Sequence, residues 1–196
     1  MRLLGLLATF LVTHSYRPGQ RSGIVTAMSS SSGSGGGSLP EECVWDYPRP
    51  AVTEAFLGTV SVTMMNGVNL AKSSKSWRTL ETSHPPTYYI PQEDIDMQYL
   101  KPTDRHTMCE WKGRASYFDL VDGSGKVIAS NVAWCYSEPT PTFTSIKNYL
   151  SFYAQHFKEC KVNEEIVVPQ EGDFYGGWIT RNLKGPFKGG AGTWGW

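Results

Sequence analysis

The chain has 196 residues, with 18 basic and 18 acidic side chains that give a formal net charge of zero. A chain without a basic excess does not neutralise nucleic-acid phosphates, so the composition excludes a general nucleic-acid binder. Hydrophobic residues make up 40% and aromatic residues 13%. This is enough for the core of one domain, and the large rings favour strands over helices.

Residues 1–38 differ in composition from the rest of the chain. They contain three Arg, many hydroxyl residues and no Asp or Glu, and they end in a Ser/Gly tract. The apolar run Leu3–Val12 is too short to span a bilayer, so no membrane association is expected. The composition favours an organellar transit peptide over a secretory signal, while a start of translation at Met28 would leave only a flexible tail on a cytoplasmic protein. In each case the segment lies outside the fold.

Alternating apolar residues and turn residues predict short strands between residues 59 and 90. Val60, Val62 and Met64 share one side of a strand, and Asn66-Gly67 then supplies a two-residue hairpin turn. Pro85-Pro86 interrupts the β structure as an extended linker. The expected strands are Thr59–Met64, Val68–Lys72, Trp77–Glu81 and Tyr88–Ile90.

The second half of the chain is predicted to contain another hairpin and one helix. A short helical turn is expected within Pro91–Leu100, and Ser116–Val121 with Lys126–Tyr136 forms a hairpin across Asp122–Gly125. Lys161–Val168 is expected to be one more short strand or hairpin. Apolar residues at helical spacing behind a capping Thr142 predict the principal α-helix, and they are Phe143, Ile146, Leu150, Tyr153 and Phe157.

These elements predict a mainly β fold, a small antiparallel domain with one principal α-helix near its C-terminal third. The expected organisation is a targeting or disordered leader over residues 1–38 and a β-rich domain over residues 39–168. A Gly- and aromatic-rich tail over residues 169–196 is expected to pack on that domain.

The four cysteines are widely spaced and form no CxxC pair; they are Cys43, Cys109, Cys135 and Cys160. A disulfide framework or a structural zinc site needs closer spacing, so free thiols and no metal are expected. Asp94-Ile95-Asp96 has a spacing typical of a solvated helical turn, and Gly123-Ser124 precedes no carboxylate pair. No phosphate-binding or dinucleotide-binding glycine motif is present, so no cofactor is expected.

Four residues are the candidates for catalysis. His84 is the best acid–base candidate, because imidazole titrates near neutrality and Pro85-Pro86 would hold it rigidly. Glu81 lies three residues earlier and could fix the imidazole tautomer. Lys112, between an aromatic residue and a glycine, could reach an anionic or carbonyl group, or could be an ordinary surface lysine. Cys109 could be a nucleophile if a cation stabilised its thiolate, although a buried structural cysteine is the more common case.

Further residues are candidates for binding a ligand. Neighbouring strand residues face opposite ways, so at most one of Tyr88 and Tyr89 is expected in any one pocket. Trp111 is the favoured pocket wall because it is next to the candidate lysine, whereas core packing is the default expectation for Trp134. Arg49 could clamp a carboxylate of a ligand, but a structural pairing with Asp46 or Asp104 is favoured.

Several sequence blocks carry a family resemblance. They are Trp45-Asp46-Tyr47-Pro48-Arg49-Pro50, Leu80-Glu81-Thr82-Ser83-His84-Pro85-Pro86-Thr87-Tyr88-Tyr89-Ile90-Pro91, Pro102-Thr103-Asp104, Cys109-Glu110-Trp111-Lys112-Gly113, Ala133-Trp134 and Phe152-Tyr153. In this order, from about Glu41 to about Val168, they resemble the family of domain of unknown function number 427, sometimes labelled nucleotidyltransferase-like. The tail block around Gly172–Trp178 resembles a cyanobacterial and algal branch, which favours a plastid location.

The resemblance implies a β-tent fold similar to the ligand-binding domain of cereblon and to methionine sulfoxide reductase B. Those relatives often hold zinc through paired CxxC motifs, and this sequence has none, so the metal is not carried over. The family label suggests nucleotidyl transfer, but the motifs above do not support that activity by themselves.

Three hypotheses for function follow from these residues. The favoured one is a domain that binds a small planar or anionic ligand in an aromatic-walled cleft. The second is an enzyme, nucleotidyltransferase-like or a hydrolase, that uses Glu81, His84 and Lys112. The third is an interaction module that docks a partner through the Gly-rich tail. The sequence leaves open whether the protein is catalytic, which ligand it takes and whether it forms oligomers.

Overall fold

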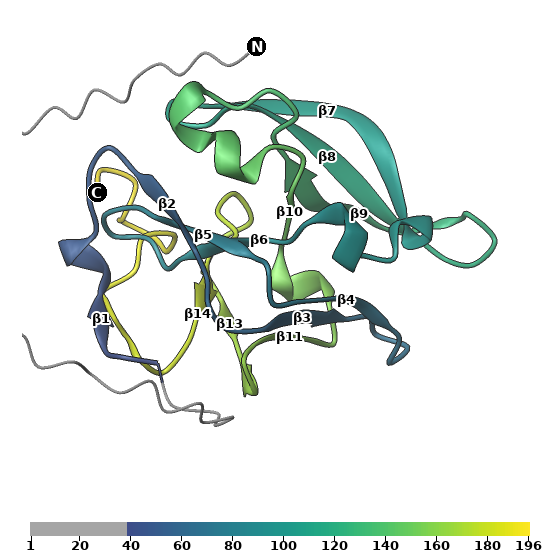
Figure 1. Ribbon diagram of the computed structural model, residues 1–196, viewed down its shortest axis with the longest axis horizontal. Helices are drawn as coiled ribbons and strands as arrows, with labels where there is room; N and C mark the ends of the chain where they lie inside the picture. The colour runs from purple at the N-terminus through teal and green to yellow at the C-terminus, as the bar shows by residue number, and fades with distance from the viewer. Residues whose placement is uncertain (1–38) are drawn as a thin grey trace, which may run out of the picture. The chain divides into compact units, whose positions relative to one another are not determined.

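The computed structural model describes residues 39–196, and the expected leader over residues 1–38 lies outside the described residues. The expectation of a mainly β fold with antiparallel sheets is confirmed (Figure 1). Between Leu39 and Trp196, no helix is long and apolar enough to cross a membrane. Short 3-10 turns are the only helical elements in this region, and they are η1 (Val44–Asp46), η2 (Gln92–Asp94), η3 (Met97–Tyr99), η4 (Pro141–Ile146) and η5 (Ala154–His156).

The strands are short except for three in the middle of the chain. They are β1 (Glu42–Cys43), β2 (Val52–Ala55), β3 (Val60–Thr63), β4 (Asn69–Ser73), β5 (Trp77–Leu80), β6 (Thr87–Tyr89), β7 (Leu100–Cys109), β8 (Gly113–Val121), β9 (Val127–Cys135), β10 (Leu150–Phe152), β11 (Glu159–Val162), β12 (Glu165–Ile166), β13 (Val168–Pro169), β14 (Trp178–Ile179) and β15 (Leu183–Lys184).

One antiparallel sheet has the strand order β12-β11-β3-β4. The expected hairpin of β3 and β4 is present, and Val60 and Val62 point from β3 into the core. In β11, Cys160 pairs with Val62 and is buried with it. One face of this sheet therefore supplies much of the main hydrophobic core.

A second antiparallel sheet has the order β10-β9-β8-β7. The expected β8–β9 hairpin is present, but no pattern in the sequence predicted β7, which is polar and contains Pro102. β7 is the edge strand, where a residue without an N–H is tolerated, and its register shifts between Pro102 and His106. The polar composition of β7 thus reflects its place at the edge.

A three-stranded sheet, β2-β5-β6, lies between these two in Figure 1 and joins the second one. Ile90, just after β6, exchanges two backbone hydrogen bonds of 2.8 Å with Leu150 of β10. This junction brings the loop between β5 and β6 close to the second sheet, and the candidate residues Glu81 and His84 lie on that loop.

The predicted principal helix over residues 142–157 is wrong. The segment forms the turn η4, then strand β10 paired with β9, then the turn η5. Asn148 has a left-handed backbone, with a φ of 62°, which ends the first turn. Leu150, Ser151 and Phe152 are all buried, because β10 is covered on both faces. The apolar residues recur at helical spacing because two turns and a fully buried strand follow one another.

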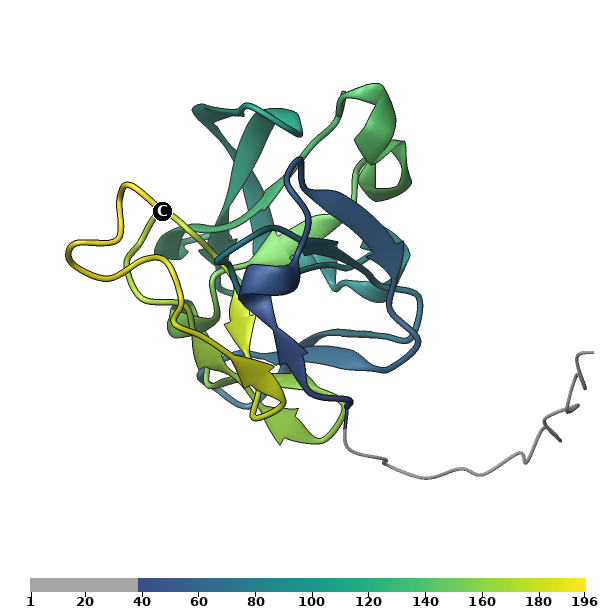
Figure 2. The ribbon, with the colours of Figure 1, turned by 90° about the vertical axis from the view of Figure 1, so that its left-hand side faces the viewer.

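The segment after Val168 contributes two short strand pairs. β14 pairs with β13, and β15 pairs in parallel with β1 near the start of the described chain. The ring of Trp178 is fully buried, and its Nε1–H donates to the carbonyl oxygen of Phe152 at 2.9 Å. At the end of the chain Trp196 packs edge-on against Trp45 of η1. In Figure 2 the yellow strand β15 lies beside β1, with which it pairs.

Candidate functional site

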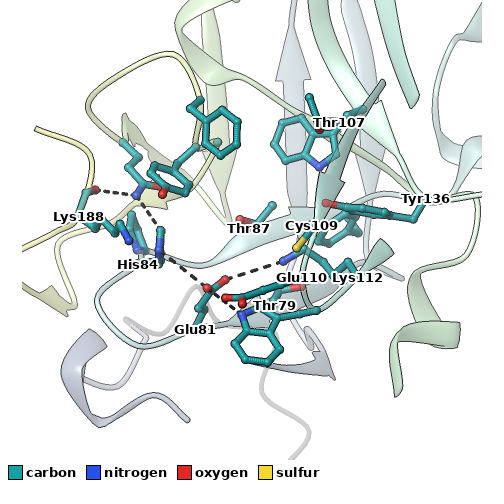
Figure 3. A pocket seen from close by; sticks show the side chains of 18 of the residues that line it. Thr79, Glu81, His84, Thr87, Thr107, Cys109, Glu110, Lys112, Tyr136 and Lys188 are labelled. Atoms are coloured by element: carbon teal, nitrogen blue, oxygen red, sulfur yellow. Dashed lines mark hydrogen bonds and ion pairs between the residues drawn. The ribbon is translucent and has the colours of Figure 1, made fainter. Parts of the chain in front are cut away.

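A cleft of about 250 Å³ opens between the β5–β6 loop, the β7–β8 turn, β9 and the C-terminal segment (Figure 3). Its polar lining includes two carboxylates, three cations and an imidazole, and its walls include several large rings. These lining residues are Arg49, Glu81, His84, Tyr89, Cys109, Glu110, Trp111, Lys112, Tyr117, Trp134, Tyr136, Tyr153, Gln170, Tyr175 and Lys188.

The carboxylate of Glu81 lies at the centre of the polar groups. Trp111 Nε1–H donates to Glu81 Oε1 at 3.2 Å. His84 Nε2 is 4.0 Å from the same oxygen, and Lys112 Nζ is 3.9 Å from Oε2. The last two distances are too long for direct hydrogen bonds. The side chains of His84 and Lys112 therefore face Glu81 without forming direct hydrogen bonds to it.

The loop that carries Glu81 and His84 is held by its backbone. His84 N–H donates to the Glu81 carbonyl at 3.0 Å, which closes a turn, and Ser83 within it has a left-handed φ of 69°. Ser83 N–H donates to the Val44 carbonyl at 3.0 Å, so the turn is tied to the start of the domain. Ser83 is buried, so its surroundings hold it in this rarely populated backbone conformation. Residues in such conformations cluster at functional sites.

Lys112 reaches the cleft from the turn between β7 and β8. Thr140 fixes this turn, because its Oγ1–H donates to the Trp111 carbonyl at 2.6 Å and its N–H to the Lys112 carbonyl at 3.2 Å. The next residue, Gly113, has a φ of 94° that favours glycine. The Lys112 side chain is only 10% exposed and its Nζ lies 5.7 Å from the centre of the Phe143 ring. A buried cation with so few partners is poised for an anionic or carbonyl group.

Burial lowers the pKa of His84 to about 4. Glu81 acts in the opposite direction, whereas Lys188, Lys112 and Arg49 each lower this pKa further. The ring also packs edge-on against Tyr175, with centroids 4.5 Å apart. His84 is therefore neutral at pH 7.

Aromatic side chains on β6 and β9, or just after β9 and β10, form the inner wall. Tyr89 of β6 is fully buried along the cleft, and burial raises the pKa of its hydroxyl. Trp134 of β9 lies 4.5 Å, centroid to centroid, from Tyr153. Tyr136 follows β9, and burial raises the pKa of its hydroxyl as well. These hydroxyls stay protonated at neutral pH, so the wall is uncharged.

The structure brings most of the sequence-predicted site residues to this cleft. Of the nine, only Tyr88 is absent from the lining, because it points the other way and packs against Phe56 and Trp178 in the main core. Those that line the cleft are Arg49, Glu81, His84, Tyr89, Cys109, Trp111, Lys112 and Trp134. Arg49 is exposed, and Cys109 is half-buried.

Sequence reasoning missed the residues of the C-terminal segment that line the cleft. Gln170 donates from Nε2 toward His84 Nδ1 at 3.1 Å, and Lys188 Nζ lies 5.6 Å from the Tyr175 ring centre. Gly176 approaches the Trp134 ring so closely that a Cβ would overlap it. The glycines of this segment indicated that its backbone approaches another part of the chain closely, but the sequence did not show which part.

Metal ligands do not converge within the described part of the chain. Residues 39–196 contain no group of three or more His, Cys, Asp or Glu side chains placed to hold a metal ion. All four cysteines are free thiols, and burial raises the pKa of Cys135 and of Cys160.

Comparison with protein families gives one match. The model described as Domain of unknown function (DUF427) matches residues 52–163, which is more than half of the chain. Glu81, His84, Cys109, Lys112 and Trp134 lie within the matched region, whereas Gln170, Tyr175 and Lys188 lie beyond it. A comparison with curated proteins finds no match.

Proposed function

The chain belongs to the DUF427 family, and we propose that it binds a small planar ligand with an anionic or carbonyl group in the cleft around Glu81. One observation carries this proposal: in an aromatic-walled cavity, His84 Nε2 and Lys112 Nζ each lie within 4.0 Å of a carboxylate oxygen of Glu81. Small-molecule sites combine apolar walls with a few converging polar groups in this way.

Lys112 and His84 suit the oxygen atoms of such a ligand. Lys112 is largely removed from water yet has no hydrogen bond of its own to Glu81. A ligand oxygen would supply the partner that this buried ammonium lacks. Glu81 then stands between two donors and can accept from an N–H or O–H group of the same ligand.

The wall rings favour a flat ligand. Trp111 and Tyr175 both line the cleft and offer ring surfaces beside the polar groups, Trp111 next to Glu81 and Tyr175 next to His84. A planar group that stacks on such a face gains dispersion and quadrupole contacts at little entropic cost. The cavity of about 250 Å³ suits a ligand of one or two rings.

An enzyme is the second candidate, hydrolytic or nucleotidyltransferase-like. It is favoured by the same cluster, because ionisable groups with one strongly shifted pKa gather in catalytic clefts. In that case Glu81 is the group with free lone pairs near a bound ligand, and Lys112 stabilises negative charge. The interaction-module hypothesis receives less support, because Trp178, one of the tail rings it needs on the surface, is fully buried.

A thermal-shift screen of the full chain against nucleotides, sugars and heterocyclic carboxylates tests the proposal. Compounds that bind the cleft raise the melting temperature by mass action. We expect this rise in the wild type and in the surface control Lys158→Met, and its loss in Lys112→Met. If no compound raises the melting temperature, or if Lys112→Met keeps the full shift, the proposal is wrong.

Turnover of the compounds that bind separates the two candidates. Chromatography of each compound after long incubation detects product. In a binding domain no product forms and His84→Ala weakens affinity. In an enzyme product forms, and Glu81→Gln abolishes turnover while affinity stays within a few-fold of the wild type.

Two finer assignments are also proposals. We propose a β-tent arrangement, supported by two four-stranded antiparallel sheets and a three-stranded sheet that joins one of them at Ile90 and Leu150. We propose a plastid location, supported by the composition of residues 1–38. Import of a fluorescent fusion of this leader into isolated chloroplasts tests the second.

A further inference from the structure

Gln170 is the only side chain that bonds the inner nitrogen of His84 in the described structure. It lies just after β13, outside the part of the chain that the family model matches, and it is 3% exposed. A buried amide beside a buried imidazole must be satisfied on both its oxygen and its nitrogen, because an unpaired polar group costs free energy.

Two backbone groups fix which way the Gln170 amide points. Gly177 N–H can only donate, and it lies 3.0 Å from one amide atom, which must therefore be the oxygen. The Lys188 carbonyl can only accept, and it lies 2.7 Å from the other, which must be the nitrogen. The orientation follows from these partners alone.

The amide nitrogen therefore faces His84. Gln170 Nε2 lies 3.1 Å from His84 Nδ1, and an amide nitrogen donates but does not accept. A proton on Nδ1 would place two donors against each other. We propose that Gln170 is a positioning residue that holds His84 as the neutral tautomer with its proton on Nε2. His84 then acts toward the cleft as a hydrogen-bond donor and has no free lone pair to take a proton.

The charges around the ring favour the same neutral state. His84 faces Glu81 on its own loop, Lys112 from the β7–β8 turn, Lys188 and Tyr175 from the C-terminal segment, and Arg49 at the mouth. Three cations oppose one carboxylate. The proton of an imidazolium would add a further positive charge to this set, and it would need a partner at Nδ1 that Gln170 does not provide.

The tautomer defines the ligand chemistry, and this step rests on the proposed binding site. The Nε2–H of His84 and the ammonium of Lys112 both donate, on either side of Glu81. A ligand atom that meets His84 must be an acceptor, such as a carbonyl, carboxylate or phosphoryl oxygen or an unprotonated ring nitrogen. A ligand that offers only N–H groups at this position is excluded.

The test is the tautomer of His84 in the full ¹⁵N-labelled chain without ligand. Long-range ¹H–¹⁵N correlation distinguishes a protonated from an unprotonated ring nitrogen, and His84→Gln assigns the signals. We expect an unprotonated Nδ1 and a protonated Nε2 from pH 5 to pH 8. A proton on Nδ1, or an imidazolium at pH 7, overturns the proposal whether or not any ligand is found.

The variant Gln170→Glu tests the positioning role. A carboxylate accepts from Nδ1, so His84 should gain a proton there and its pKa should rise by about 1 unit or more. Gln92→Glu is the matched control, because Gln92 is an exposed glutamine that donates to the Asn148 carbonyl and is expected to leave the His84 signals unchanged. An unchanged tautomer and pKa in Gln170→Glu contradicts the role of Gln170. If that variant does not fold, the wild-type spectrum still decides the tautomer.

Discussion

Glu81, His84 and Lys112 are buried or half-buried, and the Glu81 carboxylate lies 4.0 Å from His84 Nε2 and 3.9 Å from Lys112 Nζ, too far for direct hydrogen bonds. Buried polar groups are usually satisfied by close partners, as Gln170 is by Gly177 and Lys188. The loose arrangement around Glu81 therefore costs stability, and the cost is consistent with a site kept for a ligand.

The first prediction concerns His84 and pH. Its pKa is about 4 in the fold and about 6.5 in the unfolded chain, so the unfolded state binds more protons between these values. Stability therefore falls as the pH drops from 6.5 toward 4. Between pH 7 and pH 5 the wild type should lose about 2 kcal/mol more than His84→Gln. Urea unfolding at both pH values measures this, and equal losses in the two proteins would contradict the neutral buried imidazole.

The second prediction concerns Lys112. Removing a buried cation that lacks a hydrogen bond relieves its desolvation, although Glu81 loses a partner at 3.9 Å. Lys112→Met should therefore change the free energy of unfolding by less than about 1 kcal/mol, in either direction. The exposed Lys158→Met is the control in the same denaturant experiment. A loss of several kcal/mol in Lys112→Met would show that the lysine is a structural ion-pair partner.

At the scale of elements, single residues decide where turns end and strands begin. Asn148 ends η4 in the left-handed region and lets β10 start two residues later. Its carbonyl accepts from Gln92 Nε2 at 2.8 Å, and its N–H donates to the Tyr136 carbonyl at 3.0 Å. The chain direction at this residue places Leu150 against Ile90.

The third prediction tests this junction. Asn148→Gly should leave stability nearly unchanged, because glycine adopts a positive φ freely. Asn148→Val should lose about 1 to 2 kcal/mol, because a β-branched residue is strained in that region. Thermal unfolding of both variants measures the difference. Equal stability of the two would show that residue 148 does not need the left-handed conformation.

The elements that the sequence predicted are those with a local signal. Asn66-Gly67 and Asp122–Gly125 are turn sequences that predict two hairpins without any information about distant residues, and both hairpins are present. β7 and the strand β10 have no such signal. β7 is polar because it lies at a sheet edge, and β10 resembles a helix because it is buried on both faces. Their state is set by partner strands that a single sequence does not reveal.

At the scale of the whole molecule, the C-terminal segment completes both the core and the cleft. Trp178 fills the main core, and Trp178 N–H donates to the Pro86 carbonyl beside the site loop. Gly177 passes so close to that loop that a Cβ would lie 2.6 Å from the Pro85 carbonyl oxygen. The segment is therefore in direct contact with the loop that carries His84.

The fourth prediction follows from this contact. Gly177→Ala should lose about 2 kcal/mol of stability, because backbone atoms cannot move aside as a flexible side chain can. Gly195→Ala is the matched control, since a Cβ there meets nothing within 4 Å and its φ is not left-handed. Chemical denaturation compares the two. A neutral effect of Gly177→Ala would mean that the C-terminal segment can shift away from the loop.

The site was predictable from the sequence where its residues are local. Glu81 and His84 share one turn, and Trp111 and Lys112 share another, with prolines or a glycine beside them. Gln170 and Lys188 were not predictable, because they are more than 80 residues from His84 along the chain. Their approach depends on how Trp178 anchors the C-terminal segment.

The most direct test of a ligand site around Glu81 uses the indole N–H signals of the seven tryptophans. Trp111 donates to Glu81 in the cleft, whereas Trp178 donates to Phe152 in the core and does not line the cleft. The best compound from the screen is titrated into the ¹⁵N-labelled chain. We predict that the Trp111 signal moves in a saturable way while the Trp178 signal stays in place. A titration that moves Trp178 and leaves Trp111 unchanged, or that moves neither, would contradict a ligand site at Glu81.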